Sequence, residues 1–157
     1  ILVLDWDVHQ GNVTAALGAG DPNLLTVSIH GKNNFPYRKE KSDLDIELND
    51  HTGDTEYLHA LRSGLDRTLE MIEPELVIYL AGADPYHDDR FGRLALTKSG
   101  LADRDRLILE QFAARHIPVA ITMAGGYARH IQDTVDIHVQ TIQIALDIYR
   151  GHIANAL

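Results

Sequence analysis

The sequence of 157 residues contains no cysteine. This absence excludes disulfide bonds and any thiolate metal site. No apolar run reaches the roughly 18 residues that a membrane helix needs, and no basic leader with a cleavage site is present. We therefore expect a soluble, cytoplasmic protein that has no membrane partner.

Basic residues are in the minority. Lys and Arg number 14 against 23 Asp and Glu, which gives a formal net charge of −9 at pH 7. A surface of this sign repels phosphate backbones, so we expect no direct nucleic-acid partner. A surface of net negative charge would also accept basic ligands. Hydrophobic residues make up 45% of the sequence, which is ordinary for a globular domain. The chain is also long enough to bury a core.

Hydrophobic patterning predicts alternating strands and helices. Continuous apolar runs typical of buried parallel strands cover 1–7, 23–30, 75–84 and 117–126, and the alternating segment 42–48 suits an edge strand. Helical spacing covers 54–72, 97–116 and 131–149, and the segment 31–41 is expected to be a loop. This order predicts an α/β fold, with a mainly parallel sheet and helices on both faces, in a single domain over 1–157.

Polar or glycine-rich residues follow three of the predicted buried strands. Asp7 and His9 follow the first run, Asp84 ends the third, and Gly125, Gly126 and Tyr127 follow the last. A single polar residue after a strand is usually a cap or a turn residue. The carboxyl ends of parallel strands share one edge of the sheet, where ligands bind. Three such ends on one edge therefore indicate a functional site.

The residue types at this edge suit a metal ion. Side chains alternate in an extended segment, so Asp5, Asp7 and His9 lie on one side at a spacing of two. Asp84 can complete a set of two carboxylates and one imidazole with an open position, as a catalytic divalent metal requires. Zinc, ferrous iron and manganese all fit such ligands. Asp5 lies deeper and suits a structural monovalent cation or a supporting hydrogen bond. The alternative is that Asp7 caps a helix starting at 11–14.

Several segments together resemble one known family. DWDVHQGN, AGADPY with DRFGRL, and AGGY occur in this order, and TVSIHGKNNFP and KSDLDIEL lie between the first two. From Ile1 to near Thr141 the chain resembles the histone deacetylase superfamily, most of all its class IV and prokaryotic deacetylase-like members. The resemblance implies the arginase–deacetylase fold, a three-layer α/β/α arrangement. It also implies hydrolysis of an acyl amide at zinc, with Fe²⁺ or Mn²⁺ left open.

The resemblance assigns roles to individual residues. It implies Asp7, His9 and Asp84 as metal ligands and Tyr127 as the catalytic donor of a hydrogen bond to the oxyanion. It further implies a potassium-like structural cation at Asp5, Ser28 and Ile29, and a substrate channel lined by Phe35, Phe91, Gly125 and Gly126. The implied partner is a peptide that contains acyl-lysine or a small acylated amine.

The family's tandem histidine pair, which transfers protons during the reaction, has no counterpart in this sequence. The resemblance therefore implies the C-terminal, metal-binding half of a deacetylase-like catalytic domain. Residues 1–157 alone are expected to bind metal weakly, to self-associate, for example as a homodimer, and to show negligible deacylase activity. His30 is the best remaining candidate for a base, and Arg104–Arg106 is expected on a solvated helix face.

Two alternatives stay open. The missing histidine pair would also suit a non-catalytic module that binds acyl-lysine or a small molecule, or an inactive fragment. An amidinohydrolase of the same fold, with two manganese ions, would need further carboxylates around Asp84. The segment AGADPYHDDR resembles a deacetylase more closely than an amidinohydrolase.

Overall fold

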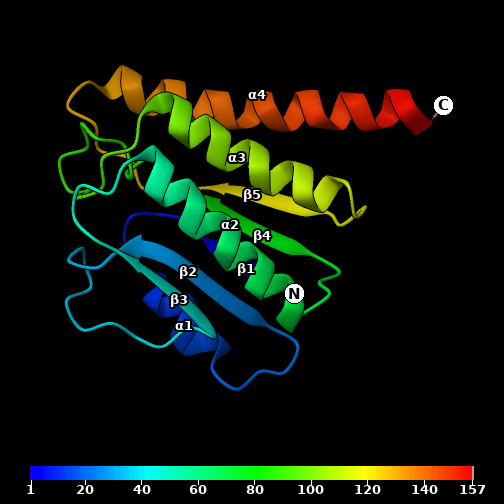
Figure 1. Cartoon of the computed structure of the whole chain (residues 1–157), viewed down its shortest axis with the longest axis horizontal. Coiled ribbons are helices and arrows are strands. Elements are labelled where there is room, and N and C mark those ends of the chain that lie inside the picture. The colour runs from blue at the N-terminus through cyan, green and yellow to red at the C-terminus, as the bar shows by residue number, and fades with distance from the viewer. Residues whose placement is uncertain (157) are drawn as a thin grey trace.

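The computed structural model describes the backbone of residues 1–156 and the side chains of residues 1–151. The predicted single domain extends to residue 157, which lies outside the described residues. Strands and helices alternate along the described chain (Figure 1). Their bounds are β1 (Leu2–Asp5), α1 (Asn12–Gly18), β2 (Leu25–Gly31), β3 (Leu44–Leu48), α2 (Asp54–Met71), β4 (Val77–Ala81), α3 (Lys98–Ala113), β5 (Val119–Met123) and α4 (Ile131–Ala156).

The strands form one parallel sheet in the order β3-β2-β1-β4-β5. The predicted α/β class and parallel sheet are confirmed, and 42–48 lies at a sheet edge as β3. The central strand is β1, where Asp5 is in register with Ser28 of β2 and with Leu80 of β4. All four residues of β1 are buried, as its apolar run predicts. The residues that follow β1 therefore emerge at the middle of the sheet's carboxyl edge.

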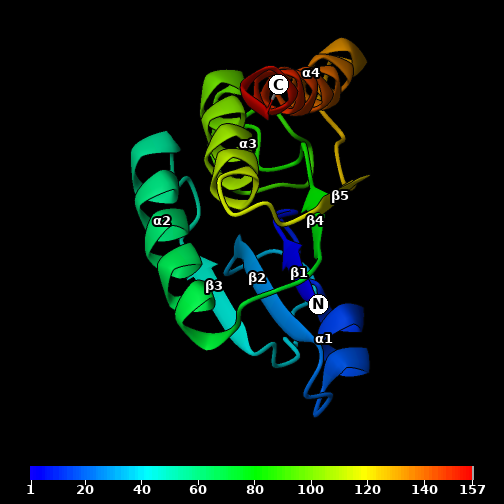
Figure 2. The ribbon, with the colours of Figure 1, turned by 90° about the vertical axis from the view of Figure 1, so that its right-hand side faces the viewer.

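Helices lie on both faces of the sheet. Figure 2 shows α2 and α3 against one face and the short α1 against the other, with α4 beside α3. The core between the sheet and the helices contains the fully buried Leu61 of α2 and Ile108 and Phe112 of α3. None of the helices in the described part of the chain combines the length and apolarity needed to cross a bilayer.

The strands end earlier than the apolar runs predict. β4 ends at Ala81 and β5 at Met123, although the runs continue to 84 and 126. Beyond these points the backbone no longer pairs as strands, since Gly125 N donates to Asp7 Oδ2 and Gly125 O accepts from Ala83 N. The two strand ends therefore turn toward each other and toward the end of β1.

The edge at β5 is apolar and exposed. Met123 is 75% exposed, and α4 exposes Val139, Ile142 and Leu146 beside it. A groove of about 570 Å³ lies between β5 and α4. Exposed apolar surface on an edge strand favours association with another polypeptide. The expected self-association therefore stays a prediction with a physical basis in this edge.

Candidate metal centre

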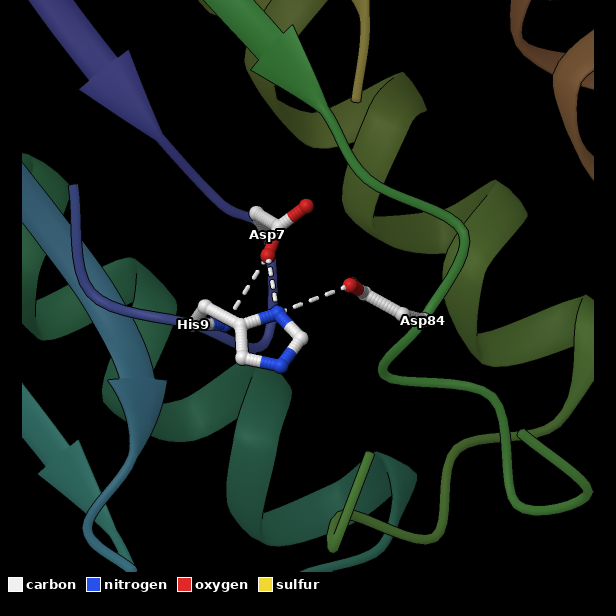
Figure 3. Close-up of side chains that lie close together, drawn as sticks. All are labelled: Asp7, His9 and Asp84. Carbon is white, nitrogen blue, oxygen red and sulfur yellow. Dashed lines mark hydrogen bonds and ion pairs between the residues drawn. The ribbon is translucent and has the colours of Figure 1, made fainter. Parts of the chain in front are cut away.

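Asp7, His9 and Asp84 lie together at the carboxyl edge of the sheet. Asp7 and His9 follow β1, and Asp84 follows β4, its neighbour in the sheet. The three side chains converge as Figure 3 shows, and one ligand-capable atom of each lies within 4.8 Å of the others. His9 Nδ1 lies 2.9 Å from Asp7 Oδ1 and 3.2 Å from Asp84 Oδ2. The parallel pairing of β1 with β4 produces this convergence, because both strands end at the same edge.

Backbone amides hold the two carboxylates in place. Asp84 Oδ1 accepts a hydrogen bond from Val8 N at 2.8 Å, and Asp7 Oδ2 accepts one from Gly125 N at 2.6 Å. Asp7 Oδ1 accepts from His9 N at 2.9 Å. The carboxylates thus connect the ends of β1, β4 and β5. The alternative role for Asp7 as a helix cap is wrong, because α1 starts after Gly11 without a side-chain cap.

The electrostatics of this cluster favour a bound cation. Burial, followed by the charge of Asp7, raises the pKa of Asp84 to about 7. Burial also opposes the charge on Asp7, but hydrogen bonds from His9 and Gly125 outweigh it and lower the Asp7 pKa. The hydrogen bond to Asp7 and the neighbouring carboxylate of Asp84 raise the pKa of His9 to about 10. Two closely spaced carboxylates therefore draw positive charge to the position between them.

The donor set fits a divalent metal. Asp84 Oδ2 is buried and accepts no hydrogen bond, although it lies at ion-pair distance from the His9 ring. Two carboxylate oxygens and one imidazole nitrogen are ligands of Zn²⁺, and Fe²⁺ and Mn²⁺ accept them as well. The cluster therefore has the chemistry of a three-ligand metal site.

Glycine is required where the β5 end approaches the cluster. A Cβ on Gly125 would overlap Asp84 Oδ2 and lie 2.6 Å from Asp7 Oδ2. A Cβ on Gly126 would lie 2.6 Å from Thr134 Cγ2. Neither distance is tolerated by real Cβ atoms, so only glycine lets this backbone lie against the carboxylates. Gly125 therefore lies against the carboxylate cluster and Gly126 against Thr134, and the role of both glycines in lining a substrate channel stays a prediction.

Asp89 holds Tyr127 and was not predicted as a site residue. The Tyr127 side chain is 50% exposed, and its backbone N donates to Asp89 Oδ2 at 2.6 Å. Asp89 Oδ1 accepts from the backbone N of Phe91 and of Gly92, both at 2.8 Å. The rings of Phe91 and Tyr127 meet edge-on with centroids 5.3 Å apart. One buried carboxylate therefore positions both residues relative to each other.

The sequence alone does not separate Asp89 from its neighbour Asp88. Both stand in the same polar segment, but Asp89 is 8% exposed whereas Asp88 forms a surface ion pair with Arg129 at 3.1 Å. The one available signal is that Asp89 precedes a turn with glycine at Gly92, where acidic side chains often accept backbone hydrogen bonds.

Phe35 and Phe91 lie on opposite loops beside His9. They are 60% and 58% exposed, and both line a groove of about 380 Å³ that also includes His9. Asn34 connects the loops, because its Nδ2 donates to Phe91 O at 2.8 Å. Gln10 anchors the Phe35 loop, since its Nε2 donates to Glu40 O at 2.7 Å. The structure thus brings both predicted channel residues to the metal cluster.

The residues predicted to hold an inner cation are neighbours in the sheet. Asp5 is in register with Ser28, and Ile29 follows in β2. Asp5 is only 6% exposed, and burial, followed by the charge of Asp7, raises its pKa to about 7. A buried carboxylate without a cationic partner fits a monovalent ion, and the assignment of such an ion to Asp5, Ser28 and Ile29 stays a prediction.

His30 is not positioned to act as a general base. Its side chain is fully buried, its Nδ1 lies 2.9 Å from Ser28 Oγ, and burial lowers its pKa. A base must reach the substrate's proton, which a side chain closed off from the rim cannot do.

The prediction of a solvated face is wrong for the first two residues of Arg104–Arg106. Arg104 is 0% and Asp105 1% exposed, and Arg104 Nη2 lies 2.8 Å from Asp105 Oδ1. Arg104 Nη1 donates to Trp6 O at 3.2 Å and to Gly82 O at 2.6 Å. These carbonyls lie directly before Asp7 and two residues before Asp84. The buried guanidinium therefore joins the two strand ends that carry the metal cluster.

The helical period contained a signal for this burial. Leu101 and Ile108 are fully buried, and they lie three residues before and four residues after Arg104. Residues at these spacings share one face of a helix. Arg104 thus lies on the apolar stripe of α3, whereas Arg106 does not.

A parallel α/β sheet that gathers two carboxylates and an imidazole at its carboxyl edge is an arrangement that could hold a metal ion. Residues 1–142 match the histone deacetylase domain, and the chain belongs to this family. Among its relatives, a protein of Picosynechococcus sp. is 43% identical over 95% of this chain and 50% of its own length. Histone deacetylase 2 of Arabidopsis thaliana is 29% identical over 87% of this chain and 37% of its own length. The chain thus spans half or less of these relatives.

Solved structures of similar fold confirm the architecture. Acetylpolyamine aminohydrolase from Burkholderia pseudomallei superposes with a TM-score of 0.76 at 23% identity, covering 92% of this chain and 44% of that one. A histone deacetylase homologue complexed with SAHA superposes with a TM-score of 0.73 at 19% identity, covering 96% of this chain and 46% of that one. The predicted arginase–deacetylase fold is therefore confirmed.

Proposed function

We propose that this chain forms the metal-binding half of a zinc-dependent deacylase that hydrolyses acyl-lysine-type amides. The observation that carries the proposal is the convergence of Asp7, His9 and Asp84 beside a loop that presents Tyr127. Membership of the histone deacetylase family supports the reaction class. The choice of zinc, and of an acyl-lysine peptide or small acylated amine, is part of the proposal.

The residues around the cluster would have different roles in such a hydrolysis. Zinc bound by the three ligands would supply a Lewis acid for the acyl carbonyl and for water. Tyr127 would donate a hydrogen bond to the oxygen that gains negative charge as the carbonyl carbon becomes tetrahedral. Phe35 and Phe91 would enclose the aliphatic stem of the substrate. Proton transfer to the leaving amine falls to residues outside this chain, because His30 is buried.

A structural role follows for the inner carboxylate. A potassium ion shared by Asp5, Ser28 and the backbone at Ile29 would neutralise the buried charge of Asp5 directly behind the metal ligands. Neutralisation there would stabilise the turn that presents Asp7 and His9.

The second candidate is a binding module without catalysis. The observation that favours it is the burial of His30, the candidate base within these residues. In that case an acyl-lysine ligand would occupy the channel without turnover.

The test compares the complete gene product, expressed from its full coding sequence, with residues 1–157. Each protein is stripped of metal, supplied with Zn²⁺, Fe²⁺ or Mn²⁺, and assayed on an acetyl-lysine reporter. We expect zinc to restore turnover in the complete protein, and activity lower by at least about 10²-fold in residues 1–157. Asp84→Asn should lose metal. The control Asp88→Asn changes a neighbouring surface carboxylate and should retain metal and turnover.

Two results would contradict the proposal. A complete protein that binds zinc but hydrolyses no acyl amide would favour the binding module. Equal activity in residues 1–157 and the complete protein would place a general base within this chain.

A further inference from the structure

The mouth of the candidate site carries charge opposite to that of the rest of the chain. Three loops surround it: 31–41, 85–93 and 125–130, which include Phe35, Phe91 and Tyr127 respectively. These loops hold seven of the 14 basic and three of the 23 acidic residues, a net formal charge of +4. The remaining seven basic and 20 acidic residues give −13. The acidity of the whole chain therefore does not describe its binding site.

Part of this positive charge is free to act on a ligand. Arg93 and Arg129 form ion pairs with Asp50 and Asp88, so their charges are partly compensated. Lys32, Arg38 and Arg90 are exposed, and within the described side chains 1–151 none of them forms an ion pair. Uncompensated cations at the mouth of a cleft attract anions and repel cations.

The groove beside His9 brings Arg90 and Arg93 close to the path of a substrate. The groove is lined by Phe35 and Tyr37 from the loop 31–41 and by Arg90 and Arg93 from the loop 85–93. Arg90 Nε donates to Tyr127 O at 3.1 Å, which holds the guanidinium next to the proposed catalytic loop. The aromatic rings suit the aliphatic part of a substrate, and guanidinium groups suit carboxylates.

We propose that this mouth selects acyl-amide substrates with a carboxylate near the acylated amine and disfavours polyamines and peptides rich in Lys and Arg. The inference rests on the proposed function for the acyl amide itself. The charge preference rests separately on the loops and the groove. It reverses the expectation from net charge that the protein tolerates basic ligands.

The test uses the complete gene product with zinc and three acetyl-lysine peptides of equal length, flanked by Glu, by neutral residues or by Lys. At about 20 mM salt we expect kcat/KM to be about tenfold higher for the Glu peptide than for the Lys peptide. At about 500 mM salt the difference should shrink to about twofold or less, because the screening length falls to about 4 Å.

A matched pair of variants locates the source of the preference. Lys32→Gln with Arg38→Gln removes two exposed, unpaired charges from the loops and should reduce the Glu-to-Lys ratio by about threefold. Arg62→Gln with Arg67→Gln removes two exposed charges from α2 and should leave the ratio unchanged. An equal effect of the two pairs would overturn the inference, because net charge would then account for the preference.

The outcomes separate this inference from the proposed function. Turnover with equal or higher kcat/KM for the Lys peptide at low salt would overturn the inference and leave the function intact. If no peptide is hydrolysed, the proposed function fails, and calorimetric binding of the same peptides tests the inference. Tighter binding of the Glu peptide would then support it, and equal or weaker binding would overturn it.

Discussion

Replacing Arg104 by methionine should destabilise the protein by about 3 kcal/mol. Breaking a buried ion pair by removing one partner typically costs about 3–5 kcal/mol, since the remaining charge stays buried. Arg104→Met leaves the Asp105 carboxylate in the interior without the guanidinium that lies 2.8 Å from it. The hydroxyls of Tyr79 and Thr141 still donate to this carboxylate, which favours the lower end of the range.

The same substitution should weaken metal binding. Arg104 Nη1 bonds the carbonyls of Trp6 and Gly82, next to the segments that carry Asp7 and Asp84. Loss of a group that orients metal ligands through their surroundings typically lowers metal affinity by about 10–100-fold. We expect about tenfold, because the carboxylates keep their bonds to the amides of Val8 and Gly125.

Arg106→Met is the matched control. Arg106 lies two residues further along α3, is 51% exposed and has only a 3.3 Å pair with Asp103. Its replacement should change stability by less than about 0.5 kcal/mol and leave metal affinity unaltered. Denaturant unfolding and zinc titration of the complete gene product measure both quantities. Equal results for the two variants would refute the argument that the buried pair supports the metal-bearing strand ends.

Three further predictions concern the candidate site in the complete gene product. Tyr127→Phe should lower kcat by about 10²-fold or more with unchanged metal content, and an unaltered kcat would remove Tyr127 from the mechanism. Gly125→Ala should lower zinc affinity at least about tenfold in a titration, because the added methyl group would displace the carboxylates of Asp7 and Asp84. Wild-type zinc affinity in this variant would contradict the close approach of the Gly125 backbone to these carboxylates. Asp89→Asn places a donor against backbone amides and should lower kcat about tenfold without loss of zinc, whereas Asp88→Asn serves as the neutral comparison.

The sequence by itself determined the fold class and the clustering of Asp7, His9 and Asp84. Apolar runs of strand length and helical stripes are local patterns, so the five strands and the helices α2, α3 and α4 could be predicted to within a few residues at most ends. The short helix α1 was not among the predicted helices. Asp7, His9 and Asp84 could be predicted because they follow strands, and parallel strands bring such positions to one edge. The resemblance to the deacetylase family added roles that spacing alone leaves open, such as that of Tyr127.

The helical period places Arg104 on the apolar stripe of α3, but only the tertiary structure decided which partners allow Arg104 and Asp89 to be buried. Arg104 and Arg106 are only two positions apart in the same helix. Only Arg104 is buried, and its guanidinium joins the segments that follow β1 and β4. Asp89 and Asp88 are adjacent, yet only Asp89 holds the backbone of Tyr127. A polar side chain becomes buried when other segments supply its hydrogen bonds and opposite charge. The partners that connect these side chains to other segments are Trp6 O and Gly82 O for Arg104 and Tyr127 N for Asp89, which lie 98, 22 and 38 residues away in the sequence. Their arrangement follows from packing and not from local pattern.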